Sequence, residues 1–427
     1  MMTLHSKQLI DYWIGTPICL ILNLLARILG FAMKRNHSIS KHPKVIVLSK
    51  YQGIGSVINA LPLVHTLRKH YPSARIIFIT TNGPLQILRL CPDVDQIFVI
   101  NDDKLLSLMW NSIISLFQLW KLKPDLFIDL EIFSKFSSII TTLSCARNRV
   151  GFYLESTLFR KGLYTHLIYF NRFQHIQEIY GRVGHLFGVT GKEPRASEIL
   201  NVTDHSDVEA KRFLTEVFGS VGDFLIVNPN AGSLCLERRW PPEKMAELIE
   251  DMAGDGLNIV LIGSPQERDF VESIYQKIPS DVLDHVAVAA GRLSFSGVIA
   301  LLRIARLMIT NDSGPFHLAI LLGIPTVSLW GPMSQKIYGP LHGAHIAIEG
   351  LVYCHPCLHM VDRPPCLGHN ICMQSIQVQQ VLKAVKLILS KDAPAEPVVW
   401  HSTESASDPE YIPGVVILRE TLSKGQG

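Results

Sequence analysis

The feature of this sequence that most restricts its fold is a repeated alternation of short apolar runs with helix-like segments. In the first half of the chain, four mainly apolar runs are separated by stretches in which apolar residues recur three or four positions apart. These runs cover residues 44–49, 75–80, 96–100 and 126–130. Runs that are apolar throughout indicate strands buried on both faces, as in a parallel sheet covered by helices.

The same alternation begins again after a polar stretch near residue 200. Its apolar runs cover residues 224–227, 258–262, 307–310 and 326–329. The sequence therefore predicts an α/β fold with two similar halves, residues 44–200 and 201–390. Ligands of such sheets bind beyond the carboxyl ends of the strands, and two such halves facing each other would form a cleft. The tail at 391–427, which carries Pro, Ser and Glu, is expected to be poorly ordered.

Composition excludes several classes of protein. Hydrophobic residues make up 48% and charged residues 18% of the 427 residues, which excludes a disordered chain. A formal net charge of +3 gives no reason to expect nucleic-acid binding. Eight cysteines are too few for a secreted scaffold built on disulfides, so reduced cytosolic thiols are the simpler interpretation.

The N-terminal segment, residues 1–43, is predicted to associate with a membrane. Residues 9–31 are apolar apart from interruptions at Asp11, Pro17, Asn23 and Arg27. No small-residue cleavage site of a signal peptide follows them. A helix lying in the membrane interface and an ordinary helix packed on the protein's own surface fit equally well. A membrane-spanning helix fits less well because the interruptions shorten the unbroken apolar stretch.

The segment at 309–332 carries the strongest chemical signal. A strand ending at Thr310 is followed by a turn and by a helix that opens with Pro315, where the missing N–H costs nothing. Asp312 or Ser313 can cap the first turn. The N-terminal N–H groups and the dipole of this helix form a seat for phosphate. Gly314 would keep the approach open, and His317 can point at the same anion. Each of these residues alone is common; their combination is not.

This segment, with N-D-S-G-P-x-H-L-A, G-I-P-T-V and W-G-P, resembles the donor-site signature of the lipopolysaccharide heptosyltransferases, glycosyltransferase family 9. Similar agreement is found at residues 228–233, 238–241, 260–265 and 290–292, and more weakly in the first half. The resemblance covers about residues 44–385. It implies the GT-B fold, which consists of two facing Rossmann-like domains with an interdomain cleft. The N-terminal domain would take the acceptor and the C-terminal domain the donor.

The resemblance also implies a set of donor-binding residues. Ser313, Gly314 and the helix start would hold the diphosphate, with Asp312 and His317 beside them. A hydroxyl from Ser233 and cations from Arg238 and Arg239 would stabilise the charge that grows on the leaving group. Gly263 and Ser264 would lie under the nucleoside. Glu267 is a weaker candidate for the ribose, and a helix-start residue is the more ordinary interpretation.

The sequence departs from the family at the general base. Where the family has an Asp after the second glycine of the N-terminal loop, this chain has Ser56. A serine of ordinary pKa cannot accept a proton at neutral pH. Glu131 is the first candidate to replace the base and Asp129 the second, although Asp129 can merely orient the loop. One alternative is a catalytically silent protein that binds nucleotide sugar without transferring it. The preferred hypothesis is a subfamily that uses a different acceptor and a different general base.

No spacing of carboxylates or histidines in the sequence indicates a catalytic metal site. Asp93-Val94-Asp95 resembles the D-x-D of other glycosyltransferases, but it follows a Cys-Pro turn and is interpreted as structural. A cluster near the C-terminus, Cys354, Cys357, Cys366 and Cys372, is a possible structural zinc site, with paired or free thiols as the alternative. No cofactor is expected to be required for catalysis.

These expectations converge on one reaction. The chain is expected to move heptose or a related sugar from ADP-heptose or a similar donor to a lipopolysaccharide-core or other lipid-linked acceptor, by an inverting and metal-independent mechanism. It would work in the cytoplasm, peripheral to the inner face of the bacterial inner membrane. A catalytically silent nucleotide-sugar-binding protein and a sugar-nucleotide epimerase on the same fold are the alternatives.

Overall fold

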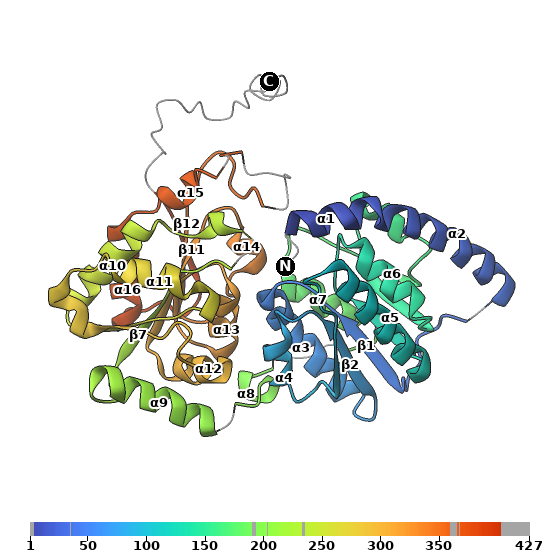
Figure 1. The fold of residues 1–427 in the computed structure, drawn as a ribbon, viewed down its shortest axis with the longest axis horizontal. Coiled ribbons are helices and arrows are strands. Elements are labelled where there is room, and N and C mark those ends of the chain that lie inside the picture. The colour runs from blue at the N-terminus through green and yellow to red at the C-terminus, as the bar shows by residue number, and fades with distance from the viewer. Residues whose placement is uncertain are drawn as a thin grey trace, which may run out of the picture. The chain divides into compact units, whose positions relative to one another are not determined.

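The computed structural model describes residues 4–34, 36–189, 194–202, 204–232, 235–358, 365–366 and 368–402. The chain divides into two compact units, residues 1–201 and 202–427 (Figure 1). Among the described residues each unit contains one sheet, and every strand pair in both sheets is parallel. The predicted α/β fold class is confirmed.

The sheet of the first unit has the order β3-β2-β1-β4-β5-β6. Its strands are β1 (Val45–Ser49), β2 (Arg75–Thr80), β3 (Gln96–Val99), β4 (Leu126–Asp129), β5 (Asn148–Tyr153) and β6 (His166–Tyr169). The helical segments are α1 (Leu4–Trp13), α2 (Gly15–Met33), α3 (Ile54–His70), α4 (Leu85–Arg89), α5 (Leu105–Leu122), α6 (Lys135–Leu143), η1 (Glu155–Arg160), α7 (Ile176–His185) and α8 (Ala196–Ile199).

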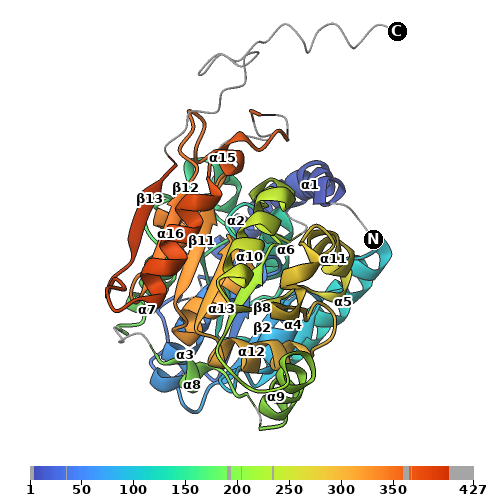
Figure 2. The ribbon, with the colours of Figure 1, turned by 90° about the vertical axis from the view of Figure 1, so that its left-hand side faces the viewer.

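Helices α5 and α6 cover one face of this first sheet. Leu119 of α5 and Ile140 of α6 are buried in one cluster with the strand residues Val47, Ile77 and Phe127. Helix α2 lies outside the sheet and contacts α6 and η1. Figures 1 and 2 show α6 between α2 and α5, so the three helices form one side of the unit.

The sheet of the second unit has the order β13-β12-β11-β10-β7-β8-β9. Its strands are β7 (Phe224–Asn228), β8 (Asn258–Leu261), β9 (Val286–Val288), β10 (Leu307–Asn311), β11 (Thr326–Trp330), β12 (His345–Glu349) and β13 (Val398–His401). The helical segments are α9 (Asp204–Phe218), η2 (Leu236–Arg238), α10 (Pro242–Gly254), η3 (Pro265–Glu267), α11 (Arg268–Tyr275), η4 (Ser280–His285), α12 (Phe295–Ile304), α13 (Gly314–Leu322), α14 (Gln335–Tyr338), α15 (Ile371–Gln374) and α16 (Val378–Leu389).

Each sheet has a point where its strand order reverses. In the first unit β1 is flanked by β2 and β4, and in the second β7 is flanked by β8 and β10. The connections that leave β1 and β4, and those that leave β7 and β10, therefore diverge to opposite sides of their sheets. Open α/β sheets bind their ligands in the crevice that such a divergence creates.

The structure corrects one prediction at the C-terminus. Residues 398–401 form the edge strand β13, paired with β12 from Ile346↔Val398 to Glu349↔His401. The prediction of poor order from residue 391 onward is therefore wrong for this strand. Residues 403–427 lie outside the described part of the chain.

Candidate active site

The turn between β10 and α13 is the centre of the candidate donor site. Ser313 is the N-cap of α13 and has extended backbone angles, and Pro315 stands in the first turn. The Ser313 side chain forms no capping hydrogen bond to this helix end. The prediction of a cap is wrong for Ser313, whose Oγ accepts a hydrogen bond from Asn228, while the Asp312 carboxylate accepts one from Arg238. The first N–H groups of a helix lack intrahelical acceptors, so an uncapped end attracts an anion.

Ser313 is held by a residue that the sequence analysis gave no role. The Asn228 side chain, at the end of β7, donates hydrogen bonds from Nδ2 to Ser313 Oγ at 2.8 Å and to Thr310 Oγ1 at 3.0 Å. All three residues are buried. Asn228 thus ties the ends of β7 and β10 together at the switch point. The sequence signal that could have identified Asn228 is its position at the end of an apolar strand.

Asp312 pairs with Arg238. Arg238 Nη1 donates to Asp312 Oδ2 at 3.1 Å, and the two side chains are 15% and 4% exposed. Arg238 Nη2 also donates to the carbonyl oxygen of Ala231 at 2.6 Å. His317 Nε2 lies 3.8 Å from Asp312 Oδ1. The structure therefore brings Arg238, Asp312, Ser313 and His317 together around the start of α13. Ser233 lies outside the described residues.

Arg239 faces a different environment from Arg238. Its guanidinium lies 3.8 Å from the ring centroid of Phe270, and Nη2 is 3.5 Å from Asn230 Oδ1. Burial lowers the pKa of Arg239. Its Nε is buried and finds no hydrogen-bond partner in the part of the chain that the structure describes. Arg239 thus stacks on an aromatic ring beside the site, whereas Arg238 is fixed at the helix end.

Gly263 and Ser264 follow β8 at the same edge of the sheet. A Cβ on Gly263 would stand 3.0 Å from Asn230 Nδ2 and 3.1 Å from a methyl carbon of Val271, so a side chain does not fit there without a shift. Ser264 forms a capping box with Glu267, in which Glu267 Oε2 accepts from Ser264 N at 2.9 Å and from Oγ at 2.8 Å. The interpretation of Glu267 as a helix-start residue is confirmed.

In the first unit, Asp129 is the centre of a buried network. Its side chain is fully buried and forms an ion pair at 3.1 Å with Arg160, which is also fully buried. The other donors to its carboxylate are Ser49 Oγ, Ser137 Oγ, Tyr164 Oη and the Glu131 backbone N–H. An acceptor hydroxyl cannot reach a carboxylate enclosed in this way. The geometry favours the loop-orienting role that the sequence left open for Asp129.

Glu131 stands at the rim of this network, with 14% of its side chain exposed. Its Oε2 accepts from Lys50 Nζ at 2.8 Å, and Oε1 accepts from Tyr51 N at 2.8 Å. Burial alone would raise the pKa of Glu131, but the Lys50 ammonium and the Tyr51 and Gln52 backbone N–H groups outweigh it and hold the pKa below its ordinary value. Glu131 is therefore ionised and fastens the loop that follows β1.

Ser56 lies in the first turns of α3 and is half-buried. Gly53, the N-cap of α3, has φ = +82°, and a Cβ there would stand 3.2 Å from Ser56 Oγ. The loop thus brings Ser56 beside a glycine whose conformation disfavours side chains. Ser56 and Glu131 both lie at the carboxyl edge of the first sheet, at its switch point.

The Asp93-Val94-Asp95 segment is structural, as interpreted from the sequence. Asp93 Oδ2 lies 2.7 Å from His65 Nδ1, and both residues are buried. Asp95 Oδ2 accepts from Arg68 Nη2 at 2.5 Å and from the Ile76 backbone N–H at 2.6 Å. Both carboxylates are thus engaged by α3 and β2.

The four clustered cysteines lie near one another in the second unit. Burial and the neighbouring Cys366 raise the pKa of the Cys354 thiol. Burial, then the neighbouring thiols, raise the pKa of Cys357 to about 11 and that of Cys372 to about 12. Among the described residues, no group of three or more His, Cys, Asp or Glu side chains is arranged to hold a metal ion. The zinc site stays a prediction.

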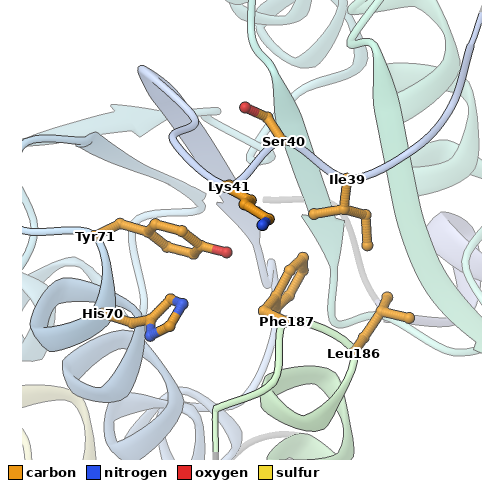
Figure 3. Close-up of a pocket in the computed structure, with 7 residues that line it drawn as sticks. All are labelled: Ile39, Ser40, Lys41, His70, Tyr71, Leu186 and Phe187. Carbon is orange, nitrogen blue, oxygen red and sulfur yellow. The ribbon is translucent and has the colours of Figure 1, made fainter.

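A surface cavity in the first unit lies away from the switch point. Figure 3 shows Tyr71, Phe187 and Lys41 around this cavity of about 370 Å³. Residues 39–41 precede β1 and Tyr71 precedes β2, so the cavity is at the amino ends of the strands. It does not belong to the candidate active site.

Comparison with known proteins shows what the chain is similar to. The sequence model described as glycosyltransferase family 9 (heptosyltransferase) matches residues 137–367. The chain is 22% identical over 352 residues to the lipopolysaccharide core heptosyltransferase OpsX of Haemophilus influenzae, a match that covers 81% of this chain and 96% of that protein. Lipooligosaccharide heptosyltransferase 2 of the same organism is 30% identical over 104 residues, which are 24% of this chain and 30% of the relative.

A solved structure shares the fold. The ADP-heptose lipopolysaccharide heptosyltransferase II of Escherichia coli superimposes with a TM-score of 0.63 at 20% identity, covering 81% of this chain and 98% of that one. The two parallel α/β sheets therefore have the GT-B type of fold.

Proposed function

We propose a reaction for this chain from the premise that it belongs to glycosyltransferase family 9, the heptosyltransferases, whose sequence model matches more than half of it. The chain transfers heptose or a related sugar from a nucleoside diphosphate donor, ADP-heptose or a close analogue, in the synthesis of the lipopolysaccharide core. The activities of its relatives, core heptosyltransferase and ADP-heptose heptosyltransferase, support this choice.

The observation that carries the proposal is the start of α13, where Ser313 forms no capping hydrogen bond, beside Arg238. The helix end offers backbone N–H groups and positive dipole charge, and Arg238 is fixed next to it. A diphosphate leaving group gains negative charge as the bond to the sugar breaks. Donors that are already in place when this charge develops lower the barrier most. Arg238 and α13 together supply the positive charge that such a reaction needs, which supports a metal-independent mechanism.

Glu131 is the proposed general base. It is ionised and partly exposed at the switch point, and a carboxylate has acceptor capacity beyond its bonds to Lys50 and Tyr51. The lowered pKa makes it a weaker base, so the acceptor has to loosen the Lys50 contact as it binds. Asp129 positions Glu131 by accepting its backbone N–H at 3.0 Å. Ser56, at the position where the family resemblance implies an Asp, would orient the acceptor hydroxyl.

The acceptor is a lipopolysaccharide-core or other lipid-linked sugar at the cytoplasmic face of the bacterial inner membrane. Attack by its hydroxyl on the anomeric carbon, with the diphosphate leaving toward α13, inverts the configuration. The bond formed joins the acceptor oxygen to the anomeric carbon, and the bond broken joins that carbon to the phosphate oxygen. The hydroxyl proton passes to Glu131.

The experiment is donor turnover by the purified full-length chain. ADP release from ADP-heptose is measured with and without a heptose-deficient core acceptor, and the product's anomeric configuration is read by NMR. Acceptor-dependent ADP release that is lost in Arg238→Ala supports the proposal. Tight donor binding without any release of nucleotide would favour the silent binding protein, and release of altered sugar without acceptor would favour an epimerase.

A further inference from the structure

Helix α2 exposes apolar side chains to solvent and turns the polar Asn23 toward the protein, the reverse of an ordinary surface helix. Its exposed residues include Leu20, Leu24, Ile28 and Phe31, of which Leu24 is 61% and Phe31 84% exposed. The first three recur every four positions and so form one stripe along the outside of the helix. Stable folds normally turn such a stripe toward their own core. Here it points to the outside.

Two of the polar residues that interrupt the apolar segment 9–33, Asp11 and Asn23, bind the protein, whereas Arg27 is exposed. The Asp11 carboxylate accepts hydrogen bonds from the backbone N–H groups of Lys135, at 3.0 Å, and Phe136, at 2.6 Å, and so caps α6. Asn23 Nδ2 donates to the Phe159 carbonyl oxygen at 2.7 Å. The predicted alternative, a helix packed on the protein's own surface, is therefore confirmed for the packing of this segment. The segment Leu9–Met33 is also long and apolar enough to cross a membrane by length and composition, but these bonds hold it along α6.

Helix α5 likewise buries small polar side chains and exposes large apolar ones. Its Ser112 and Ser115 are buried, whereas Leu106, Trp110 and Phe117 are 81%, 64% and 55% exposed. Such an arrangement leaves large apolar and aromatic side chains in water, which monomeric soluble proteins avoid over large contiguous areas.

The two apolar helices belong to one side of the first unit. Helix α6 contacts both α2 and α5 and lies between them in Figures 1 and 2. Lys7 of α1 pairs with Asp102, just before α5, at 2.6 Å. Of the 32 large apolar side chains exposed in the described part of the chain, 12 lie in residues 9–33 and eight on α5.

The charged residues on α2 and α5 themselves are cations, whereas Asp102, which pairs with Lys7, and Asp103 precede α5. Arg27 is the single charged residue of α2, and Lys121 is the single one of α5. The exposed Lys34 ends α2, and Lys104 and Lys123 flank α5. Residues 1–201 carry 23 Lys and Arg against 12 Asp and Glu, a formal charge of +11, while residues 202–427 carry 17 against 25, a charge of −8. The positive charge is thus concentrated in the unit that exposes the apolar helices.

We propose that the outer sides of α2 and α5 form one docking face for an anionic lipid bilayer, with both helices lying in the interface and neither spanning it. Apolar and aromatic side chains enter the region between headgroups and acyl chains, and the flanking lysines meet lipid phosphates. This inference rests on the proposed function for its location, because a lipid-linked acceptor is reached from the bilayer surface. It adds the two-helix face and the lipid charge that the face requires.

A second copy of the chain fits this face less well than a bilayer. Two copies joined through it would bring two units of charge +11 together, whereas an anionic surface attracts the same charge. Aromatic residues at the ends of the apolar stretches, such as Tyr12, Trp13 and Trp120, suit a headgroup boundary, where one part of the ring is dry and the other wet.

The test is co-sedimentation of the full-length chain with vesicles. Phosphatidylcholine vesicles with roughly one-third phosphatidylglycerol are compared with pure phosphatidylcholine vesicles, at low and high salt. The variants are Trp110→Glu/Phe117→Glu on α5 and Leu24→Glu/Ile28→Glu on α2. Val208→Glu, at a position on α9 that is 64% exposed, is the matched control. Circular dichroism melting checks that each variant is folded.

We expect each double variant to bind anionic vesicles at least about tenfold more weakly than the wild type, and the control to bind as well as the wild type. Binding by both double variants at the wild-type level would overturn the proposal. So would a wild type that ignores vesicles but forms dimers that Trp110→Glu/Phe117→Glu dissolves. Transfer to a delipidated, water-soluble core acceptor is measured in parallel. If that activity persists while vesicle binding fails, the docking face is refuted and the proposed function stands.

Discussion

Arg238 donates a hydrogen bond to Asp312 across 3.1 Å, and both residues stand beside the first turn of α13. The carboxylate holds the guanidinium in place before a ligand arrives, so little reorganisation is needed when charge develops on a phosphate. Asp312 also neutralises part of the Arg238 charge. The N-terminal end of α13 is therefore needed as a second source of positive charge.

Replacing Arg238 by Ala should lower kcat for sugar transfer by about 10²–10³-fold, the usual effect of losing one preorganised donor to developing charge. Arg238→Lys should recover part of the loss, because it keeps the charge without the planar fork. Steady-state kinetics with ADP-heptose and a core acceptor measure both. Arg306→Ala, which removes a surface partner of Asp223, is the control. A kcat within about twofold of wild type for Arg238→Ala would remove Arg238 from the reaction.

Asp129→Asn should destabilise the first unit by about 3–5 kcal/mol, because it leaves the fully buried Arg160 without its counter-ion. Urea unfolding followed by circular dichroism measures the change in free energy. Glu250→Gln, at an exposed position of α10, should change it by less than about 0.5 kcal/mol. A loss of activity with unchanged stability would contradict the positioning role and return Asp129 to the list of candidate bases.

The pairing of Glu131 with Lys50 should make stability depend on acid pH. The folded-state pKa of Glu131 lies below its ordinary value of 4.5, so its contribution is present above that value and is lost as pH falls through the lowered pKa. Thermal melting from neutral to acid pH should show a decline in wild type that is smaller in Glu131→Gln.

The same substitution tests catalysis. If Glu131 accepts the proton, Glu131→Gln should lower kcat by about 10²–10⁴-fold at neutral pH. A variant that melts like wild type at neutral pH yet keeps full activity would show that another group accepts the proton. Ser56→Asp, which restores the family's residue, should then be examined for a gain in rate.

Gly53→Ala should destabilise the loop between β1 and α3 by more than about 1 kcal/mol, since φ = +82° disfavours any side chain. The new methyl group would also stand against Ser56 Oγ. Gly83→Ala is a suitable control, because its Cβ meets no atom within 4 Å and its φ is not positive. Equal melting temperatures for the two variants would be inconsistent with the described loop.

The predicted zinc site is tested by elemental analysis. If zinc is bound, the purified chain should contain about one equivalent, and Cys354→Ser or Cys372→Ser should lower both the zinc content and the melting temperature. Cys145→Ser, an exposed thiol in the first unit, is the control. A metal-free protein whose stability is unaffected by a chelator would leave the cysteines as ordinary thiols.

The sequence predicted the parts of the fold that depend on local pattern. Runs such as 75–80 became strands because a parallel sheet buries both of their faces, and the helix from Pro315 began where the turn residues indicated. Strands β5, β6, β9, β12 and β13 were missed. Of these, Asn148–Tyr153 and His345–Glu349 mix polar with apolar residues and form only against neighbouring strands. Their burial comes from tertiary pairing, which no local pattern records.

The candidate site was predictable in its residue types but not in its contacts. Asn228 as the holder of Ser313, and Arg160 as the counter-ion of Asp129, lie 85 and 31 positions from their partners. Capping of α13 by Ser313 was predicted from proximity along the chain and is wrong, because its hydroxyl accepts a hydrogen bond from Asn228 at the end of β7.

The bond between the Asp11 carboxylate and the start of α6 has a practical consequence. Trimming the first 33 residues, an obvious step toward a more soluble sample, would leave two backbone N–H groups of α6 without their acceptor and would uncover Tyr164, which packs against Cys19. Because Tyr164 also donates to Asp129, the damage would reach the loop that carries Glu131. Helices α1 and α2 are therefore an integral part of the first unit, and detergent is a better route to soluble protein than truncation.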